Sequence, residues 1–195
     1  DACLLVAPYY NKPSQEGLFQ HFKKVAEEVD IKQILYNVPS RTGCDLLPST
    51  VSRLADMENV VGIKEASGDM VRCRELLKLC GDRIRIYGGD DATARQLLLE
   101  GGHGNISVTA NVVPDQMQRM CALAMQGHAD GALAIDATLA GLHDLLFVEG
   151  NPVPVKWAMA TLGMIGPGIR LPLVELSAGF HGVLSDAMRK AGLLK

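Results

Sequence analysis

Residues 59–64 read Asn59-Val60-Val61-Gly62-Ile63-Lys64. The apolar residues of this segment follow one another and do not alternate with polar ones, so a strand formed here is expected to be buried on both faces. Strands of this kind are typical of parallel sheets that are covered by helices. The segment therefore predicts an α/β fold.

The same arrangement is repeated on both sides of this segment. Each β-rich apolar run is followed by a short turn and then by a stretch with helical periodicity. Five successive βα units favour either a doubly wound sheet or a (β/α)8 barrel. We expect strands at 3–7, 33–38, 60–64, 83–87 and 105–108, and helices at 14–29, 48–57, 69–80, 92–101 and 114–126.

The pattern changes after residue 126. From there the sequence predicts helices only, at 128–148, 154–162 and 173–191. We therefore expect two domains, with the later part of a barrel at 1–126 and a helical C-terminal domain at 127–195.

Composition restricts the class of protein. The 195 residues are 48% hydrophobic and 21% charged, and the formal net charge is -3. These values predict a soluble globular protein and argue against a disordered chain or a partner that is a nucleic acid. No apolar run approaches the ~20 residues that a membrane span needs. The five cysteines are scattered without a CxxC pair, and the five histidines form no HxxxH or HExxH pair. We thus expect free thiols in a reducing cytoplasm and no metal.

Ligands of parallel α/β folds bind beyond the carboxyl ends of the strands. In this chain those positions bring Tyr9, Tyr10, Tyr36 and Lys64 together. Gly88-Gly89-Asp90-Asp91 lies at another strand end, but its acidic residues would repel a phosphate, and one of them is more simply a helix N-cap. No nucleotide site is expected.

Lys64 ends a buried strand and allows two interpretations. It can be a strand-terminal lysine whose ammonium group reaches solvent. Alternatively, burial favours the neutral amine, which can attack a carbonyl group, while Tyr36 moves the protons that imine formation requires. Arg41 follows the strand of Tyr36, where it is either a surface residue or a bidentate ligand for a substrate carboxylate.

Four motifs together resemble those of the dihydrodipicolinate synthase family, in order and along the whole chain. They are Tyr36-Asn37-Val38-Pro39-Ser40-Arg41-Thr42-Gly43, Gly62-Ile63-Lys64-Glu65-Ala66-Ser67-Gly68-Asp69, Ala7-Pro8-Tyr9-Tyr10-Asn11-Lys12-Pro13-Ser14-Gln15-Glu16-Gly17 and Asn151-Pro152-Val153-Pro154-Val155-Lys156-Trp157. The resemblance implies a (β/α)8 barrel with a C-terminal helical domain, in a cytoplasmic homotetramer. It also implies a lyase that needs no cofactor.

The resemblance implies a role for each candidate residue. Lys64 condenses with pyruvate, Tyr36 relays protons, and the enamine then attacks aspartate 4-semialdehyde in the diaminopimelate route to lysine. Arg41 holds the carboxylate of the semialdehyde. Tyr10 enters the site of a neighbouring subunit, the backbone of Gly89 and of Ile106 lines the pyruvate pocket, and Tyr9 contacts lysine in members that lysine inhibits.

Two alternatives stay open. N-acetylneuraminate lyases and keto-deoxy-sugar acid aldolases share the lysine and the Tyr-Asn-x-Pro turn, although Arg41 favours a small aldehyde that carries a carboxylate. The chain can also be a non-catalytic fragment. Family members have a long stretch before the motif at 7–17 that supplies the first barrel strands. The chain starts at Asp1 within a predicted strand, so we expect that it lacks this first third and is inactive by itself.

Overall fold

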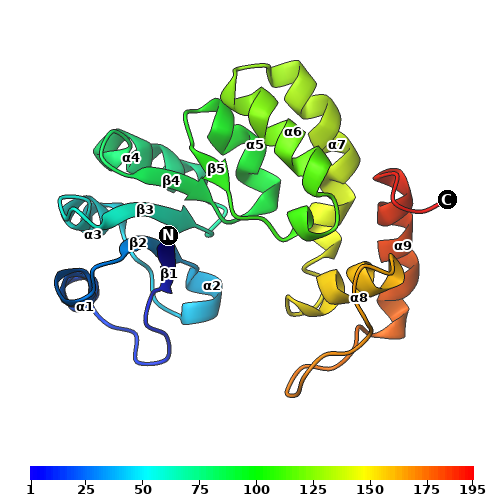
Figure 1. Cartoon of the computed structure of the whole chain (residues 1–195), viewed down its shortest axis with the longest axis horizontal. Coiled ribbons are helices and arrows are strands. Elements are labelled where there is room, and N and C mark those ends of the chain that lie inside the picture. Colours follow the sequence, from blue (N-terminus) through cyan, green and yellow to red (C-terminus); the bar gives the residue numbers. More distant parts are fainter. The chain divides into compact units, whose positions relative to one another are not determined.

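The computed structural model describes residues 1–195, which form two compact units, 1–106 and 107–195. The sequence-based division into 1–126 and 127–195 stays a prediction about domains. Unit 1 contains a sheet of five parallel strands in the order β1-β2-β3-β4-β5 (Figure 1). The strands are β1 (Ala2–Val6), β2 (Lys32–Asn37), β3 (Val60–Glu65), β4 (Arg85–Gly88) and β5 (Gly104–Asn105).

The strand order decides between the two predicted architectures. A doubly wound sheet reverses its order at a switch point, whereas here every strand lies beside the one that precedes it in the chain. Right-handed crossovers then bring successive helices to one face of the sheet, and α1 contacts α3, which contacts α4 (Figure 1). This is the winding of a (β/α)8 barrel. The helices of unit 1 are α1 (Gln15–Glu28), α2 (Pro39–Thr42), α3 (Pro48–Leu54), α4 (Met70–Cys80) and α5 (Asp91–Leu99).

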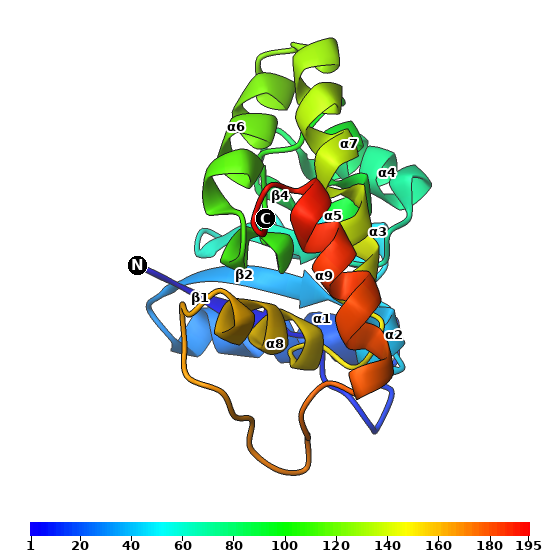
Figure 2. The ribbon, with the colours of Figure 1, turned by 90° about the vertical axis from the view of Figure 1, so that its right-hand side faces the viewer.

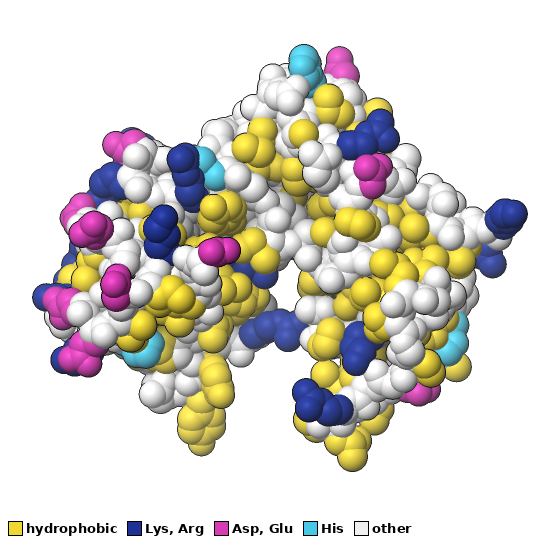
Figure 3. Space-filling view, in the orientation of Figure 1, with side chains coloured by type: hydrophobic (Ala, Val, Ile, Leu, Met, Phe, Trp, Pro, Cys, Tyr) yellow, Lys and Arg dark blue, Asp and Glu magenta, His cyan; other side chains and the backbone are white.

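The core of unit 1 lies between the sheet and these helices. Leu35, Ile63 and Ile86 stand in register on neighbouring strands and are fully buried. Leu18 and Phe22 of α1 belong to the same cluster. Charged side chains gather instead over the outer helices (Figure 3), so these helices are amphipathic in the predicted way.

The opposite face of the sheet differs from the expectation. Burial on both faces was predicted for residues 59–64, yet Lys64 is only half-buried. On the neighbouring strands Tyr36 is also half-buried, and Leu4 and Val6 of β1 are 44% and 40% exposed. The five strands form an open sheet rather than a closed tube, so no strand from the far side covers this face.

The fifth strand is shorter than predicted. It contains Gly104–Asn105 instead of residues 105–108. The Ile106 N–H still donates to the Gly88 carbonyl at 2.8 Å, but β4 ends at Gly88 and offers no further partner. The chain therefore turns into the 3-10 helix η1 (Thr109–Asn111).

Unit 2 is helical, and α7 contacts both α6 and α9 (Figure 2). The helix predicted at 173–191 is wrong at its beginning, because α9 starts only at His181. Leu173 and Val174 are exposed, and the backbone of Ser177 is not helical. The helical spacing of the apolar residues before His181 therefore does not reflect a packed helix. None of the helices is both long and apolar enough to cross a membrane. Unit 2 contains η1, α6 (Pro114–Met125), α7 (Ala129–Leu145), α8 (Val153–Thr161), η2 (Ala178–Phe180) and α9 (His181–Lys190).

Candidate active site

Lys64 and Tyr36 meet on the open face of the sheet. They are directly paired in the β2–β3 register, and Tyr87 of β4 continues the same row. The Lys64 Nζ lies 4.5 Å from the centroid of the Tyr36 ring. The structure thus brings the predicted nucleophile and the predicted proton relay into contact.

The surroundings of Lys64 favour its neutral form. Burial lowers the pKa of the Lys64 amine, because the ammonium ion loses hydration. The nearby carboxylate of Asp91 opposes this shift, and the charge of Arg41 adds to it. Compared with an ordinary lysine, more of this amine is unprotonated at a given pH, and that is the form that attacks a carbonyl carbon.

Tyr36 is shifted in the other direction. Burial raises the pKa of the Tyr36 hydroxyl, although the charge of Arg41 acts against this effect. The hydroxyl therefore stays protonated and can both donate and accept a hydrogen bond. A half-buried tyrosine in this state is suited to relay protons beside an amine.

Arg41 is positioned by α2, a one-turn helix that the sequence analysis did not predict. Pro39 occupies the start of this helix, and Gly43 ends it with φ 69°, a conformation that favours glycine. The Arg41 side chain is exposed, and its charge influences the pKa of both Lys64 and Tyr36. The predicted cation is thus close to the predicted pair.

Gly89 lies directly against the stem of Lys64. A Cβ atom at this position would be 2.8 Å from the Lys64 Cε and 2.6 Å from the Ala66 Cβ, which is closer than real Cβ atoms approach. Only glycine leaves room for the lysine stem here. Ile106 follows β5, two strands from Lys64, and its N–H donates to the Gly88 carbonyl.

Tyr9 and Tyr10 are not part of this cluster. They lie in the loop between β1 and α1 and are 68% and 91% exposed. Tyr10 also has φ 68°, in the left-handed region that is uncommon for residues other than glycine. Their side chains face solvent and are not placed against Lys64 or Tyr36. The functions expected of them therefore stay predictions.

Two further residues near Lys64, Tyr87 and Asp91, were not predicted from the sequence as residues of the active site. The Tyr87 ring covers the positions of Gly62 and Gly104, where a Cβ would be 3.1 and 3.0 Å from ring carbons. Asp91 is buried and accepts a 2.8 Å hydrogen bond from the Asn105 amide. A tyrosine at a predicted strand end was a usable signal for Tyr87.

The capping prediction for the Asp90-Asp91 pair is confirmed for Asp90. Its carboxylate accepts a hydrogen bond from the Thr93 N–H at 3.0 Å, which caps α5. Asp91 does not cap α5; its carboxylate accepts from the Asn105 amide instead. No group of three or more His, Cys, Asp or Glu side chains in the structure is arranged to bind a metal ion.

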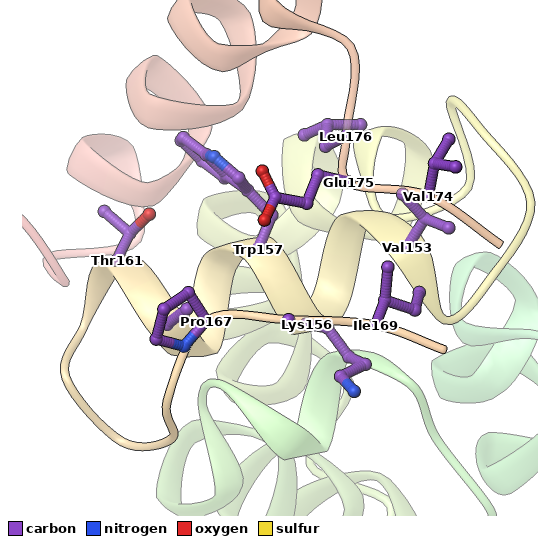
Figure 4. A pocket seen from close by; sticks show the side chains of 11 residues that line it. Val153, Lys156, Trp157, Thr161, Pro167, Ile169, Val174, Glu175 and Leu176 are labelled. Carbon is purple, nitrogen blue, oxygen red and sulfur yellow. The ribbon is translucent and has the colours of Figure 1, made fainter. Parts of the chain in front are cut away.

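Unit 2 has a cavity of its own, of about 290 Å³, beside α8 (Figure 4). Trp157 and Glu175 line it, and the amino end of Lys156 points away from Glu175. None of the residues predicted for the active site lines this cavity. Lys156 is useful as a comparison lysine, because it lies in one of the four sequence motifs.

Nearly the whole chain matches one family of proteins. A sequence model described as the dihydrodipicolinate synthetase family matches residues 1–191. The chain is 58% identical over all 195 residues to the 4-hydroxy-tetrahydrodipicolinate synthase of Alcanivorax borkumensis, and covers 66% of that protein. It is 57% identical over 194 residues to the synthase of the same name from Pseudomonas aeruginosa, again covering 66%. The chain thus spans about two thirds of the length of these relatives.

Solved structures agree with this match. The chain is similar to the crystal structure of the chloride-inhibited dihydrodipicolinate synthase from Acinetobacter baumannii complexed with pyruvate, with a TM-score of 0.97 and 49% sequence identity. All of this chain and 67% of that one are covered. Together with the sequential strand order, this likeness confirms the barrel class and excludes the doubly wound alternative.

Proposed function

Since the chain belongs to the dihydrodipicolinate synthetase family, we propose that the protein containing it is a 4-hydroxy-tetrahydrodipicolinate synthase. It condenses pyruvate with aspartate 4-semialdehyde on the diaminopimelate route to lysine. The observation that carries this proposal is the half-buried Lys64 amine, with its lowered pKa, 4.5 Å from the Tyr36 ring.

The reaction begins at Lys64. Its neutral amine attacks the keto carbon of pyruvate, and loss of one water from the carbinolamine leaves a protonated imine. Removal of a proton from the methyl carbon gives an enamine, which attacks the aldehyde carbon of aspartate semialdehyde. The amino group of the semialdehyde then displaces Lys64 from the imine carbon, which closes the ring and frees the lysine.

Tyr36 and Arg41 assist these steps. The Tyr36 hydroxyl passes protons to and from the carbinolamine oxygen, and the position of its ring beside the Lys64 amine supports this function. Arg41 binds the carboxylate of the semialdehyde as a bidentate ligand. The exposure of the Arg41 residue, and the influence of its charge on Lys64 and Tyr36, support this.

The remaining predicted residues take the functions that the resemblance implies. The backbone of Gly89 and of Ile106 lines the pyruvate pocket, and the absence of a side chain at Gly89 supports this. Tyr10 enters the site of a neighbouring subunit, for which its 91% exposure leaves it available. Tyr9 contacts lysine if the enzyme is inhibited by it. The protein acts as a cytoplasmic homo-oligomer, expected to be a tetramer. The 195 residues alone should not turn over, because the open face of the sheet lacks its cover.

The proposal is tested by trapping the imine in the natural protein that contains this chain. Pyruvate and borohydride should reduce an adduct onto the peptide that carries Lys64, and peptide mass mapping locates it. Lys156 serves as the internal comparison, because it should stay unmodified. An adduct on Lys156, or none, would exclude the proposed mechanism.

Substrate choice is tested with the same protein. Turnover should be seen with pyruvate plus aspartate semialdehyde, and not with N-acetylneuraminate or a keto-deoxy sugar acid. In Arg41→Ala the use of the semialdehyde should fall far more than the rate of imine formation. Equal losses of both steps would contradict the function assigned to Arg41.

A further inference from the structure

Asn37 and Glu65 lie directly behind the Lys64–Tyr36 pair. They are the next residues along β2 and β3, they are paired in the same register, and they face the helix-covered side of the sheet. Asn37 is 0% and Glu65 is 2% exposed. A buried carboxylate beside a buried amide is expensive in free energy unless both are fully hydrogen-bonded, and the proposed chemistry does not use either group.

The two side chains are joined to each other. The Asn37 Nδ2 donates to the Glu65 Oε2 at 3.0 Å, and the Ser67 N–H donates to the Glu65 Oε1 at 2.8 Å. Each carboxylate oxygen therefore accepts from an N–H donor. Burial raises the pKa of the Glu65 carboxyl, while these two donors favour its ionised form.

Asn37 also holds the segment that follows Arg41. Its Nδ2 donates to the Asp45 Oδ1 at 3.0 Å, and its Oδ1 accepts from the Leu46 N–H at 3.0 Å. Arg72 in turn forms a 2.5 Å ion pair with Asp45. All hydrogen-bonding atoms of the Asn37 amide are thus used, and they link β2, β3 and the chain after α2.

This arrangement affects the reacting side chains through the backbone. Successive residues of a strand point to opposite faces, so fixing positions 37 and 65 also fixes the directions in which Tyr36 and Lys64 leave the sheet. Backbone hydrogen bonds also hold the two positions in place. The Ala66 N–H donates to the Asn37 carbonyl, and the Gly89 N–H donates to the Glu65 carbonyl. A shift of about 1 Å in such a site can cost about 100-fold in rate.

We propose that the Asn37–Glu65 pair positions the Lys64 amine and the Tyr36 hydroxyl for imine formation, so that both are positioning residues for the reaction. This inference rests on the proposed function. Its distinguishing feature is polarity, because the pair needs one donor at position 37 and one acceptor at position 65.

The variants use this polarity. Glu65→Gln keeps size but places an N–H group against either the Asn37 amide or the Ser67 N–H, whichever way the new amide turns. Asn37→Asp places two carboxylates together. The double variant Asn37→Asp/Glu65→Gln restores one donor facing one acceptor and leaves the net charge unchanged. The double variant loses the amide N–H of residue 37 that donates to the Asp45 carboxylate.

The control variant is Asp45→Asn. It breaks the Arg72 ion pair and disturbs the outer end of the network, but it leaves the Asn37–Glu65 hydrogen bond in place. It should lower the melting temperature while kcat stays within about threefold of the wild type. A structural function alone would make kcat follow stability in all the variants.

The experiment measures kcat, the KM for each substrate, the rate of pyruvate imine formation and the melting temperature on the natural protein. Glu65→Gln and Asn37→Asp should each reduce kcat and the rate of imine formation by about 100-fold, with the KM for the semialdehyde within about threefold. The double variant should recover at least tenfold. If Glu65→Gln does not fold, Glu65→Asp, which withdraws the carboxylate by one methylene, should still reduce the rate by about tenfold.

The outcomes separate the two proposals. A wild-type protein that forms no pyruvate adduct refutes the proposed function. A wild-type protein that forms the adduct, with single variants that keep the wild-type rate, refutes the positioning function alone. Absence of recovery in the double variant, or a kcat loss in Asp45→Asn equal to that of Glu65→Gln, also refutes it.

Discussion

The two faces of the sheet in unit 1 are made by alternate residues of the same strands, yet their properties are opposite. Toward the helices stand Leu35, Ile63 and Ile86, apolar and without exposure. Toward the open side stand Tyr36, Lys64 and Tyr87, polar at their ends and half-buried. One face therefore stabilises the sheet, and the other presents Tyr36 and Lys64, whose pKa values the surroundings shift.

The difference predicts that stability and reactivity can be changed separately at the apolar positions of one face and the site positions of the other. The polar pair Asn37–Glu65 is the exception, because it lies on the helix-covered face and is proposed to act on the reaction. Adjacent residues such as Ile63 and Lys64 belong to different faces, so a substitution at one position should affect the free energy of unfolding and a substitution at the next should affect the reaction. The following experiments test this separation.

Lys64→Met should have the largest effect on turnover. Removing the nucleophile leaves no amine to form the imine, so turnover should fall by more than about 1000-fold. Pyruvate turnover and borohydride trapping measure it. Lys156→Met is the matched control and should keep the wild-type rate. A pyruvate adduct that persists in Lys64→Met would show that Lys64 is not the residue that forms the imine.

Tyr36→Phe should have the next largest effect. The ring over the Lys64 Nζ is kept while the hydroxyl is lost, so kcat should fall by about 100- to 10,000-fold, as is typical when a general acid–base group is removed. Steady-state kinetics measure the loss, and urea unfolding should show little change in stability. A large loss of stability with unchanged kcat would show that Tyr36 on the open face contributes to folding and not to the reaction.

Ile63→Ala should affect the other face. It leaves a cavity between the sheet and the helices, so the free energy of unfolding should fall by about 2–5 kcal/mol. Chemical denaturation measures this change, and turnover per folded molecule should stay within a few-fold. If Lys64→Met destabilised the protein as much as Ile63→Ala does, the two faces would not be separable.

The smallest expected effect concerns the pH dependence of imine formation. Arg41 lowers and Asp91 raises the pKa of Lys64. In Arg41→Gln that pKa should therefore rise, and the pH at which imine formation is half-maximal should move upward. In Asp91→Asn it should move downward. Trapping rates measured from pH 6 to 10 show both shifts, and a shift of equal sign in the two variants would contradict this electrostatic origin.

Much of this could be predicted from the sequence, and the reasons are local. The apolar runs predicted the bounds of β1 to β4 closely, because strands buried beneath helices are rich in such residues. Tyr36 and Lys64 were expected together, because the ends of parallel strands meet at one edge of the sheet. The four motifs also led to the family.

Other features required the structure. Gln33 pairs with Val60, but the register shifts before Ile34, which pairs with Gly62, and no local pattern contains such a shift. Asn37 and Glu65 are 28 positions apart, and their hydrogen bond depends on that register. Apolar strand residues by themselves also do not reveal whether a sheet closes, so the extent of the open face required the structure.

The sequential strand order also affects how unit 1 is assembled during synthesis. Each strand from β2 to β5 pairs with a strand that has already been made, and chains emerge from the ribosome with their N-terminal residues first. The sheet can therefore grow one βα unit at a time. Every step closes only a short loop of chain, so little entropy is lost at each addition. Formation of these five strands should thus keep pace with translation, because each of β2 to β5 pairs with the strand made just before it.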